Sequence, residues 1–288
     1  MHWQSGHQHV GIIFHLVGVL PPCILVPWQF LPVIRHSAMW FHRLNGYLNV
    51  ALLLLGIIGG LMIARNSMGG SYETQILFGV FGVYPAVSLI LAYVNIKLLQ
   101  IDQHRAWMLR AWAVAAAVIS ERLIGMAASR IMSKLGYFYV TMPCRTIDYI
   151  TSNYGGSQMM LYPSCAEDPT GWAAVKMDFY SETSPEQIGA SITGSFGGSL
   201  LVALLLHSWG VECYLALTTA ARDRLKQVSY EKQLARGWRK PGDMGLTPNN
   251  WGDLPAWLPI SNSKEDHRES EGENNSTMMQ ERSERSDA

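Results

Sequence analysis

The chain has 288 residues, and its 22 Lys and Arg residues balance its 22 Asp and Glu residues, so the formal net charge is zero. A nucleic-acid-binding protein shows a basic stripe interleaved with aromatic residues, and none is visible here, so we expect no nucleic-acid partner. The four cysteines form no CxxC or other metal-ligand spacing, so we also expect no metal site.

Five stretches are long and apolar enough to cross a bilayer, because a span needs roughly 20 mostly apolar residues for about 30 Å of hydrocarbon. In lipid the backbone must satisfy its own hydrogen bonds, so each stretch is expected to be a helix. The predicted fold class is all-α: a polytopic membrane helix bundle with a lumenal cap loop and a disordered C-terminal tail. The possibility of a sixth helix, short or re-entrant, stays open. The five stretches are Val10–Val33, Tyr47–Ala64, Ile76–Leu98, Trp107–Ala127 and Ile188–Leu217.

The first stretch is not typical of a cleaved signal peptide, which has a basic n-region and a plain apolar core. This stretch has no basic n-region, and four prolines interrupt it. We therefore expect a kinked membrane helix. The prolines are Pro21, Pro22, Pro27 and Pro32.

Two similar His-Arg pairs open the second and fourth spans. They are His42-Arg43 and His104-Arg105. Both spans run in the same direction, so the two pairs are predicted to form a polar ring at one membrane boundary. Three interpretations stay open: interfacial anchoring by snorkelling Arg side chains, a phosphate-binding cluster, or haem ligation by His42 and His104.

Ionisable side chains inside the spans are costly, and they usually face the interior of the bundle. Arg110 and Glu121 are 11 residues apart in the fourth span, which places them on one helix face, roughly 16 Å apart along the axis. Glu121 either pairs with a neighbouring Arg as a structural contact or, if desolvated, becomes a usable general acid. The fifth span adds His207 and Glu212, and the first adds His15.

The segment from about 128 to 187 is too long for a plain turn, and long loops of this kind are often functional. It is rich in aromatic residues, so we expect a lumenal cap or a re-entrant segment. Cys144 and Cys165 lie in this segment and could pair in an oxidising lumen. Asp178 and Glu186, near its end, are further candidate acids. The Gly and Ser residues that follow favour a close-packing helix face.

The distribution of basic residues orients the spans, because they gather on the cytosolic side. An N-out, C-in topology places 12 Lys and Arg residues on the cytosolic side and 5 on the other. We therefore expect a lumenal N-terminus and a cytosolic C-terminus. The expected membrane is that of the endoplasmic reticulum, and the plasma membrane stays open. The predicted organisation is a transmembrane bundle over residues 1–219, a cytosolic basic helix and linker over 220–260, and a disordered tail over 261–288. The Asn274 and Asn275 sequons would then stay unglycosylated.

The runs His42–Tyr47 and His104–Ala111 resemble a family of predicted membrane proteins of unknown function that is found in bacteria and fungi. This resemblance covers about residues 36–130. Glu186–Ile192, His207 and Gln227–Leu234 are similar to the filamentous-fungal branch and extend it to about residue 240. The family implies no common chemistry. In size, span content and intramembrane acids the chain is also similar to fungal membrane-bound terpene cyclases of the ascofuranone type.

The leading functional hypothesis is an integral-membrane enzyme, an isomerase of fungal secondary metabolism. It would cyclise a hydrophobic prenyl or epoxy-prenyl substrate by proton donation, without a cofactor. Cation-stabilising aromatics would be Trp112, Trp209 and Tyr214. The first alternative is a haem-binding oxidoreductase using His42 with His104, or His15 with His207. The second is a non-enzymatic lipid-binding or structural protein, in which Arg43 and Arg105 hold headgroups. The catalytic candidates are Glu121, Glu186, Asp178, Arg110 and His207.

Overall fold

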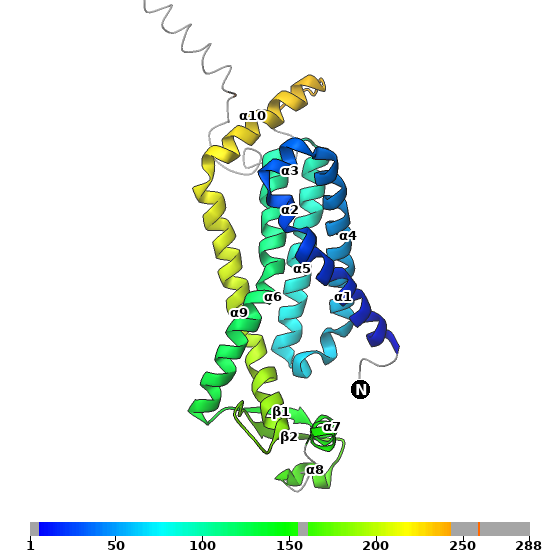
Figure 1. Ribbon diagram of the computed structural model, residues 1–288, viewed down its shortest axis with the longest axis vertical. Coiled ribbons are helices and arrows are strands. Elements are labelled where there is room, and N and C mark those ends of the chain that lie inside the picture. Colours follow the sequence, from blue (N-terminus) through cyan, green and yellow to red (C-terminus); the bar gives the residue numbers. More distant parts are fainter. Residues whose placement is uncertain (1–5, 155–160, 243–258, 260–288) are drawn as a thin grey trace, which may run out of the picture. The chain divides into compact units, whose positions relative to one another are not determined.

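The computed structural model describes residues 6–154, 161–242 and 259 (Figure 1). The chain divides into two compact units, one with residues 1–89 and 109–213 and the other with residues 90–108 and 214–288. We describe each unit by itself. The predicted tail at 261–288 and its two sequons lie outside the described residues.

Within the described residues, five helical segments are long and apolar enough to span a membrane. The chain is therefore a multi-pass integral membrane protein with an all-α fold, as predicted. The helices extend beyond the apolar stretches, most of all the fourth, which was predicted as Trp107–Ala127. The segments are α1 with α2 (Gly6–Phe30), α4 with η1 (Met39–Asn66), α5 (Tyr72–Lys97), α6 (Ile101–Leu135) and α9 (Pro185–Leu217).

The first span is interrupted, as its prolines predict. Helix α1 (Gly6–Leu25) contains Pro21 and Pro22, and it ends before a bend at Val26. Two short helices follow, α2 (Pro27–Phe30) and α3 (Pro32–Ser37), and each begins with a proline. Proline has no N–H to donate and is tolerated in the first helical turn, so these positions favour new helix starts.

Helix α1 packs against α4 (Met39–Ile63) in the first unit, and both are drawn in blue (Figure 1). Their backbones meet at glycines. A Cβ added to Gly18 would lie 2.2 Å from the Gly56 nitrogen, and one added to Gly59 would lie 2.4 Å from the His15 nitrogen. The His15 Nδ1 atom also hydrogen-bonds the Gly56 carbonyl at 2.9 Å. Small residues permit this close approach in lipid, where apolar side chains gain little from leaving the hydrocarbon.

Two 3₁₀ turns, η1 (Ala64–Asn66) and η2 (Met68–Gly70), lead from α4 into α5. Residues of α5, α6 and α9 in the first unit form a common apolar cluster. Its buried members come from α6 and α9, and partly buried side chains of α5 cover them. The buried members are Val114, Ala117, Phe196, Leu200, Ala203 and Leu204.

The long segment before α9 folds into a small cap in the first unit. Strands β1 (Tyr139–Pro143) and β2 (Trp172–Lys176) pair antiparallel, with Tyr139 opposite Lys176. Helices α7 (Cys144–Tyr154) and α8 (Pro163–Glu167) lie between the strands in sequence. A disulfide joins Cys144 to Cys165, a pairing that the sequence left open. The segment begins after Leu135 and not near residue 128, and the sequence analysis did not predict its two strands.

Helix α10 (Thr219–Ala235) occupies the predicted basic segment and belongs to the second unit. It packs on the turn between α5 and α6 through two fully buried polar side chains. Ser229 Oγ accepts a hydrogen bond from the Ile101 N–H at 2.9 Å. Gln233 Nε2 donates to the Leu98 carbonyl at 2.9 Å.

Candidate functional site

Glu121 is the most deeply buried ionisable side chain of α6, with 2% of its surface exposed. Its Oε2 atom is buried and accepts no hydrogen bond within the described part of the chain. The Nε atom of Arg122 lies 3.5 Å from this oxygen, but the Arg122 side chain is 56% exposed. A buried carboxylate is costly without full compensation, and protonation removes most of that cost. Both predicted interpretations of Glu121, the ion pair and the desolvated acid, therefore have a structural basis.

Serine side chains continue from Glu121 along the contact between α6 and α9. A Cβ on Gly125 would lie 3.1 Å from Glu121 Oε1 and 3.7 Å from Ser199 Oγ, so Gly125 brings the two side chains to one place. Ser199 Oγ is buried and makes no hydrogen bond to the described residues. Further along, Ser129 and Ser195 share a 2.8 Å hydrogen bond. We call Glu121, Ser129, Ser195 and Ser199 the polar seam.

His207 lies on α9 and contacts α6 through both ring nitrogens. The Nδ1 atom is 2.6 Å from the Ala113 carbonyl oxygen, and the Nε2 atom is 2.8 Å from Ser120 Oγ. Ser120 directly precedes Glu121, so the His207 ring bonds the residue next to the acid. Haem ligation by this histidine would require one of the two hydrogen bonds to break.

Arg110 does not reach Glu121. Its guanidinium instead binds the carboxylate of Glu212 on α9 with two hydrogen bonds, of 2.6 and 2.9 Å. This bidentate geometry fixes both side chains and joins the two helices. The prediction that Arg110 acts in catalysis remains untested, and its visible contact is structural.

The other two candidate acids belong to the cap. Glu186, in the first turn of α9, is fully buried, and its Oε1 atom accepts a 3.0 Å hydrogen bond from the Tyr162 hydroxyl. Burial, together with the bond to Glu186 and its charge, raises the pKa of Tyr162. Asp178 Oδ1 accepts the Tyr180 N–H at 3.0 Å, and the Asp178 N–H donates to the Gln187 carbonyl at 3.2 Å. These contacts hold the cap on the start of α9.

The histidines of the haem alternative are distributed over both units. His42 lies in α4, in the first unit, whereas His104 lies in α6, in the second. His104 Nδ1 is 2.9 Å from the Ala92 carbonyl oxygen. Metal-bound histidines often make such a contact with the ring nitrogen that does not bind the metal, although it also occurs in purely structural histidines. No cluster of three or more metal-ligating side chains occurs among the described residues.

Two of the predicted cation-stabilising aromatics, Trp209 and Tyr214, differ in their surroundings. Trp209 is 75% exposed, which is typical of a side chain that faces lipid. The ring of Tyr214, in the second unit, already lies under the Arg105 guanidinium at 5.5 Å, and its hydroxyl accepts a 3.3 Å hydrogen bond from that side chain. The Arg122 guanidinium, which lies beside Glu121, is 5.7 Å from the ring of Phe196.

The sequence analysis missed the polar seam and the partner of Arg110. The sequence does contain a signal for the polar seam: Ser191, Ser195 and Ser199 recur every four residues, as side chains on one helix face do. This stretch was interpreted only as a packing face.

Residues 7–143 match the model of a family described as a predicted membrane protein, DUF2306. This match supports the resemblance seen over residues 36–130 and begins earlier, at the start of α1. It ends at the last residue of β1, so α9 and half of the polar seam lie outside it. No curated protein and no solved structure matches the chain.

Proposed function

We propose that this protein is an integral-membrane enzyme in which Glu121 protonates an apolar substrate and starts its cyclisation. The observation that carries the proposal is the burial of this carboxyl, with one oxygen that accepts no hydrogen bond from the described residues. Burial disfavours the charged form of a carboxyl group, and a carboxyl that keeps its proton can act as an acid.

The substrate class is a prenyl chain with a terminal epoxide or alkene. The Glu121 carboxyl gives its proton to the epoxide oxygen, the carbon–oxygen bond breaks, and the carbon becomes cationic. An alkene of the same chain attacks this carbon and forms the ring. Loss of a proton from a neighbouring carbon, back to the carboxylate, then forms a new alkene, so the product is an isomer of the substrate. No cofactor is consumed.

The neighbours of Glu121 have supporting roles in this scheme. Arg122 stabilises the carboxylate that remains after proton transfer, because its guanidinium lies 3.5 Å away. Ser199, whose buried hydroxyl makes no hydrogen bond to the described residues, is a polar group on the facing helix that a substrate oxygen could contact. His207 and the Arg110–Glu212 pair hold α9 against α6, so they are positioning residues for the acid.

The direct test is the Glu121→Gln variant, purified in detergent and assayed with farnesylated phenols that carry a terminal epoxide. Glutamine keeps the shape but cannot donate a carboxyl proton, so product formation is expected to fall about 100-fold or more. Glu182→Gln, at an exposed cap position, is the matched control and should keep full activity. Product formation by a folded Glu121→Gln protein at the wild-type rate contradicts the proposal.

Glu186→Gln and Asp178→Asn separate the three acids. The Glu186 side chain joins the cap to α9 by a hydrogen bond, so Glu186→Gln is expected to lower stability more than turnover per folded molecule. The Asp178 side chain accepts its hydrogen bond from the nearby Tyr180 N–H, so Asp178→Asn is expected to change both little. If only Glu186→Gln or Asp178→Asn abolishes turnover in a folded protein, the acid is in the cap and Glu121 is not the donor.

An absorbance spectrum of the purified protein, oxidised and then reduced, tests the haem alternative. A Soret band whose α and β bands sharpen on reduction, and which is lost in His104→Ala, would replace the cyclase proposal with a redox function. The lipid-binding alternative predicts that Glu121→Gln changes nothing, whereas joint neutralisation of Arg43 and Arg105 abolishes headgroup binding.

A further inference from the structure

Four exposed basic side chains gather at the end of α10 in the second unit. They are Lys232, Arg236, Arg239 and Lys240, and we call them the basic cluster. No acidic residue occurs between the first and the last of them. A concentration of positive charge of this kind attracts an anionic partner.

The fold holds α10 firmly, so this charge has a defined place. Gln233 is buried next to the basic cluster, and its Nε2 atom reaches Gln100 Oε1 at 3.1 Å. Its Oε1 atom accepts the Gly242 N–H at 2.6 Å, and the Gly242 carbonyl accepts a hydrogen bond from Gln100 at 2.8 Å. This closed network pins both the helix and the chain that follows the basic cluster.

The basic cluster ends a helix that directly follows a candidate membrane span. Helix α9 ends at Leu217, Thr218 interrupts the helix with φ −101° and ψ 44°, and α10 begins at Thr219. There is no linker between the spanning helix and α10. A 17-residue helix is about 25 Å long, so its far end lies at most about that distance from the end of α9.

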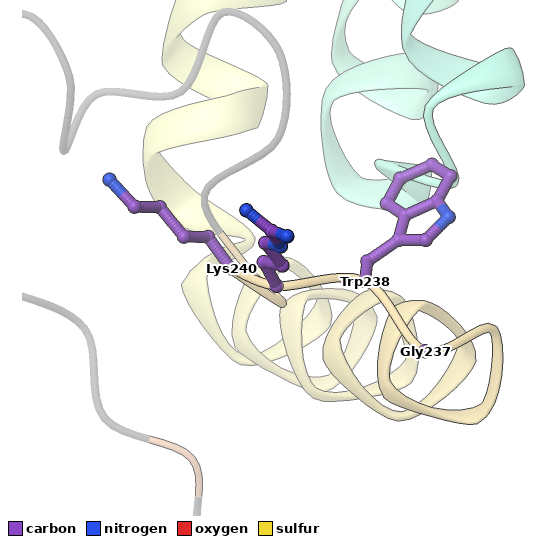
Figure 2. Close-up of a pocket in the computed structure, with 4 residues that line it drawn as sticks. Gly237, Trp238 and Lys240 are labelled. Carbon is purple, nitrogen blue, oxygen red and sulfur yellow. The ribbon is translucent and has the colours of Figure 1, made fainter.

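A turn completes this end of α10. Gly237 has a φ of +72°, which glycine adopts without strain, and it redirects the chain after the helix. A shallow pocket follows, lined by Gly237, Trp238, Arg239 and Lys240. Figure 2 shows the Trp238 and Lys240 side chains projecting from the same side of this turn. Tryptophan is enriched where membrane meets water, and Arg and Lys bind phosphate there.

We infer that the basic cluster binds the headgroups of anionic phospholipids in the membrane that holds the protein. The phosphate of the lipid would meet Arg236, Arg239 and Lys240, and the Trp238 ring would lie at the level of the glycerol backbone. This site is distinct from Glu121 and does not depend on the proposed cyclase function. The same residues would enrich anionic lipid around the end of α9.

The experiment titrates the full-length protein, purified in mild detergent, with phosphatidylserine or phosphatidylcholine and counts bound lipids by native mass spectrometry. The test variant is Arg236→Gln/Arg239→Gln/Lys240→Gln. The control is Arg65→Gln/Lys134→Gln/Arg145→Gln, which removes three exposed charges from other parts of the chain. Each basic side chain near an anionic surface contributes about fivefold in affinity.

We expect the wild type to bind phosphatidylserine at least tenfold more tightly than phosphatidylcholine. The test variant should lose most of this preference, and the control variant should keep it. If the test variant does not fold, the same preference in the wild type must fall in high salt, because salt screens exposed charges. Equal affinity for the two lipids overturns the inference, and so does equal loss in both variants. Displacement of the lipid by millimolar inorganic phosphate would identify a free-phosphate site instead.

Discussion

Two helix pairs in the first unit make contact by different means. Helices α1 and α4 meet at glycines, with backbone against backbone. Two hydrogen bonds also join them, one between the His15 ring and the Gly56 carbonyl and one from Asn45 Nδ2 to the Leu25 carbonyl. Helices α6 and α9 meet through serines, His207 and the Arg110–Glu212 pair, around a small apolar cluster. The first pair depends on shape and the second on hydrogen bonds.

The difference shows where chemistry can reside in a membrane protein. A glycine contact leaves no space for a substrate and offers it no polar group. A polar seam presents donors and acceptors that are costly in lipid, and such groups are usually functional. Glu121, a buried carboxyl beside the Gly125–Ser199 contact of α6 with α9, therefore marks the more promising of the two pairs.

The largest expected effect tests the glycine contact. Gly18→Ala places a Cβ 2.2 Å from the Gly56 nitrogen, so the helices must separate. We expect a loss of about 3 kcal/mol in the free energy of unfolding, at the upper end for overpacking. Thermal unfolding in detergent measures it. Gly198→Ala is the control, since a Cβ there meets nothing within 4 Å. Equal stability of the two variants would show that α1 and α4 do not depend on close packing.

The second prediction asks whether polar contacts also secure the cap on α9. Tyr162→Phe leaves Glu186 Oε1 without its donor in a buried site, which is expected to cost about 1–3 kcal/mol. Protection of the cap from proteolysis is the measurement. Tyr149→Phe, at an exposed position of α7, is the control.

This tyrosine also gives the cap a pH dependence. Because the folded state raises the pKa of Tyr162 above 10.0, the stabilisation is fully present below that pH and is lost as the pH rises through the folded value. Wild-type stability should therefore fall more steeply than that of Tyr162→Phe in strong base. Identical pH profiles for the two proteins would refute a protonated Tyr162 in the folded cap.

A smaller effect is expected at the end of the α6–α9 contact that carries the ion pair. Arg110→Ala removes both hydrogen bonds to Glu212, whose side chain is 51% exposed. Solvent screening limits the loss to about 1 kcal/mol. Restoration of stability in Arg110→Glu/Glu212→Arg, measured by thermal unfolding, would demonstrate a direct pair. A loss in the double variant equal to the sum of the two single losses would exclude it.

The smallest expected effect concerns the two serines of the polar seam. A double-mutant cycle of Ser129→Ala and Ser195→Ala isolates their 2.8 Å hydrogen bond. Hydrogen bonds between membrane helices contribute about 0.6 kcal/mol on average. A coupling energy indistinguishable from zero would leave the polar seam with a chemical role only, and not a structural one.

The sequence predicted the parts of the fold that depend on local composition. The number of spans and the interrupted first helix are confirmed. The disulfide between Cys144 and Cys165, which the sequence allowed but left open, is present. The predicted stretch Trp107–Ala127 was shorter than α6. The ends of this helix carry Asp102, Ser129 and Lys134, which lower the mean hydropathy without ending a helix.

Features that depend on distant residues could not be predicted. Helical periodicity placed Arg110 and Glu121 on one face, but the partner of Arg110 is Glu212, 102 residues later and on another helix. Likewise, β1 and β2 pair across two intervening helices and not through a tight turn, so no hairpin signal marks them. The acid Glu121 was found from composition, whereas the groups around it required the structure.

The length of α6 and α9 has a consequence for the membrane itself. They contain 35 and 33 residues, so each is about 50 Å long against a hydrocarbon layer of about 30 Å. The excess is taken up by tilt or by turns that stand outside the hydrocarbon. Bilayer thickness therefore decides which polar groups of these helices lie in lipid and which lie in water. Lipids with short acyl chains would hydrate the end of α6 that holds Ser129, whereas lipids with long chains would draw it into the hydrocarbon.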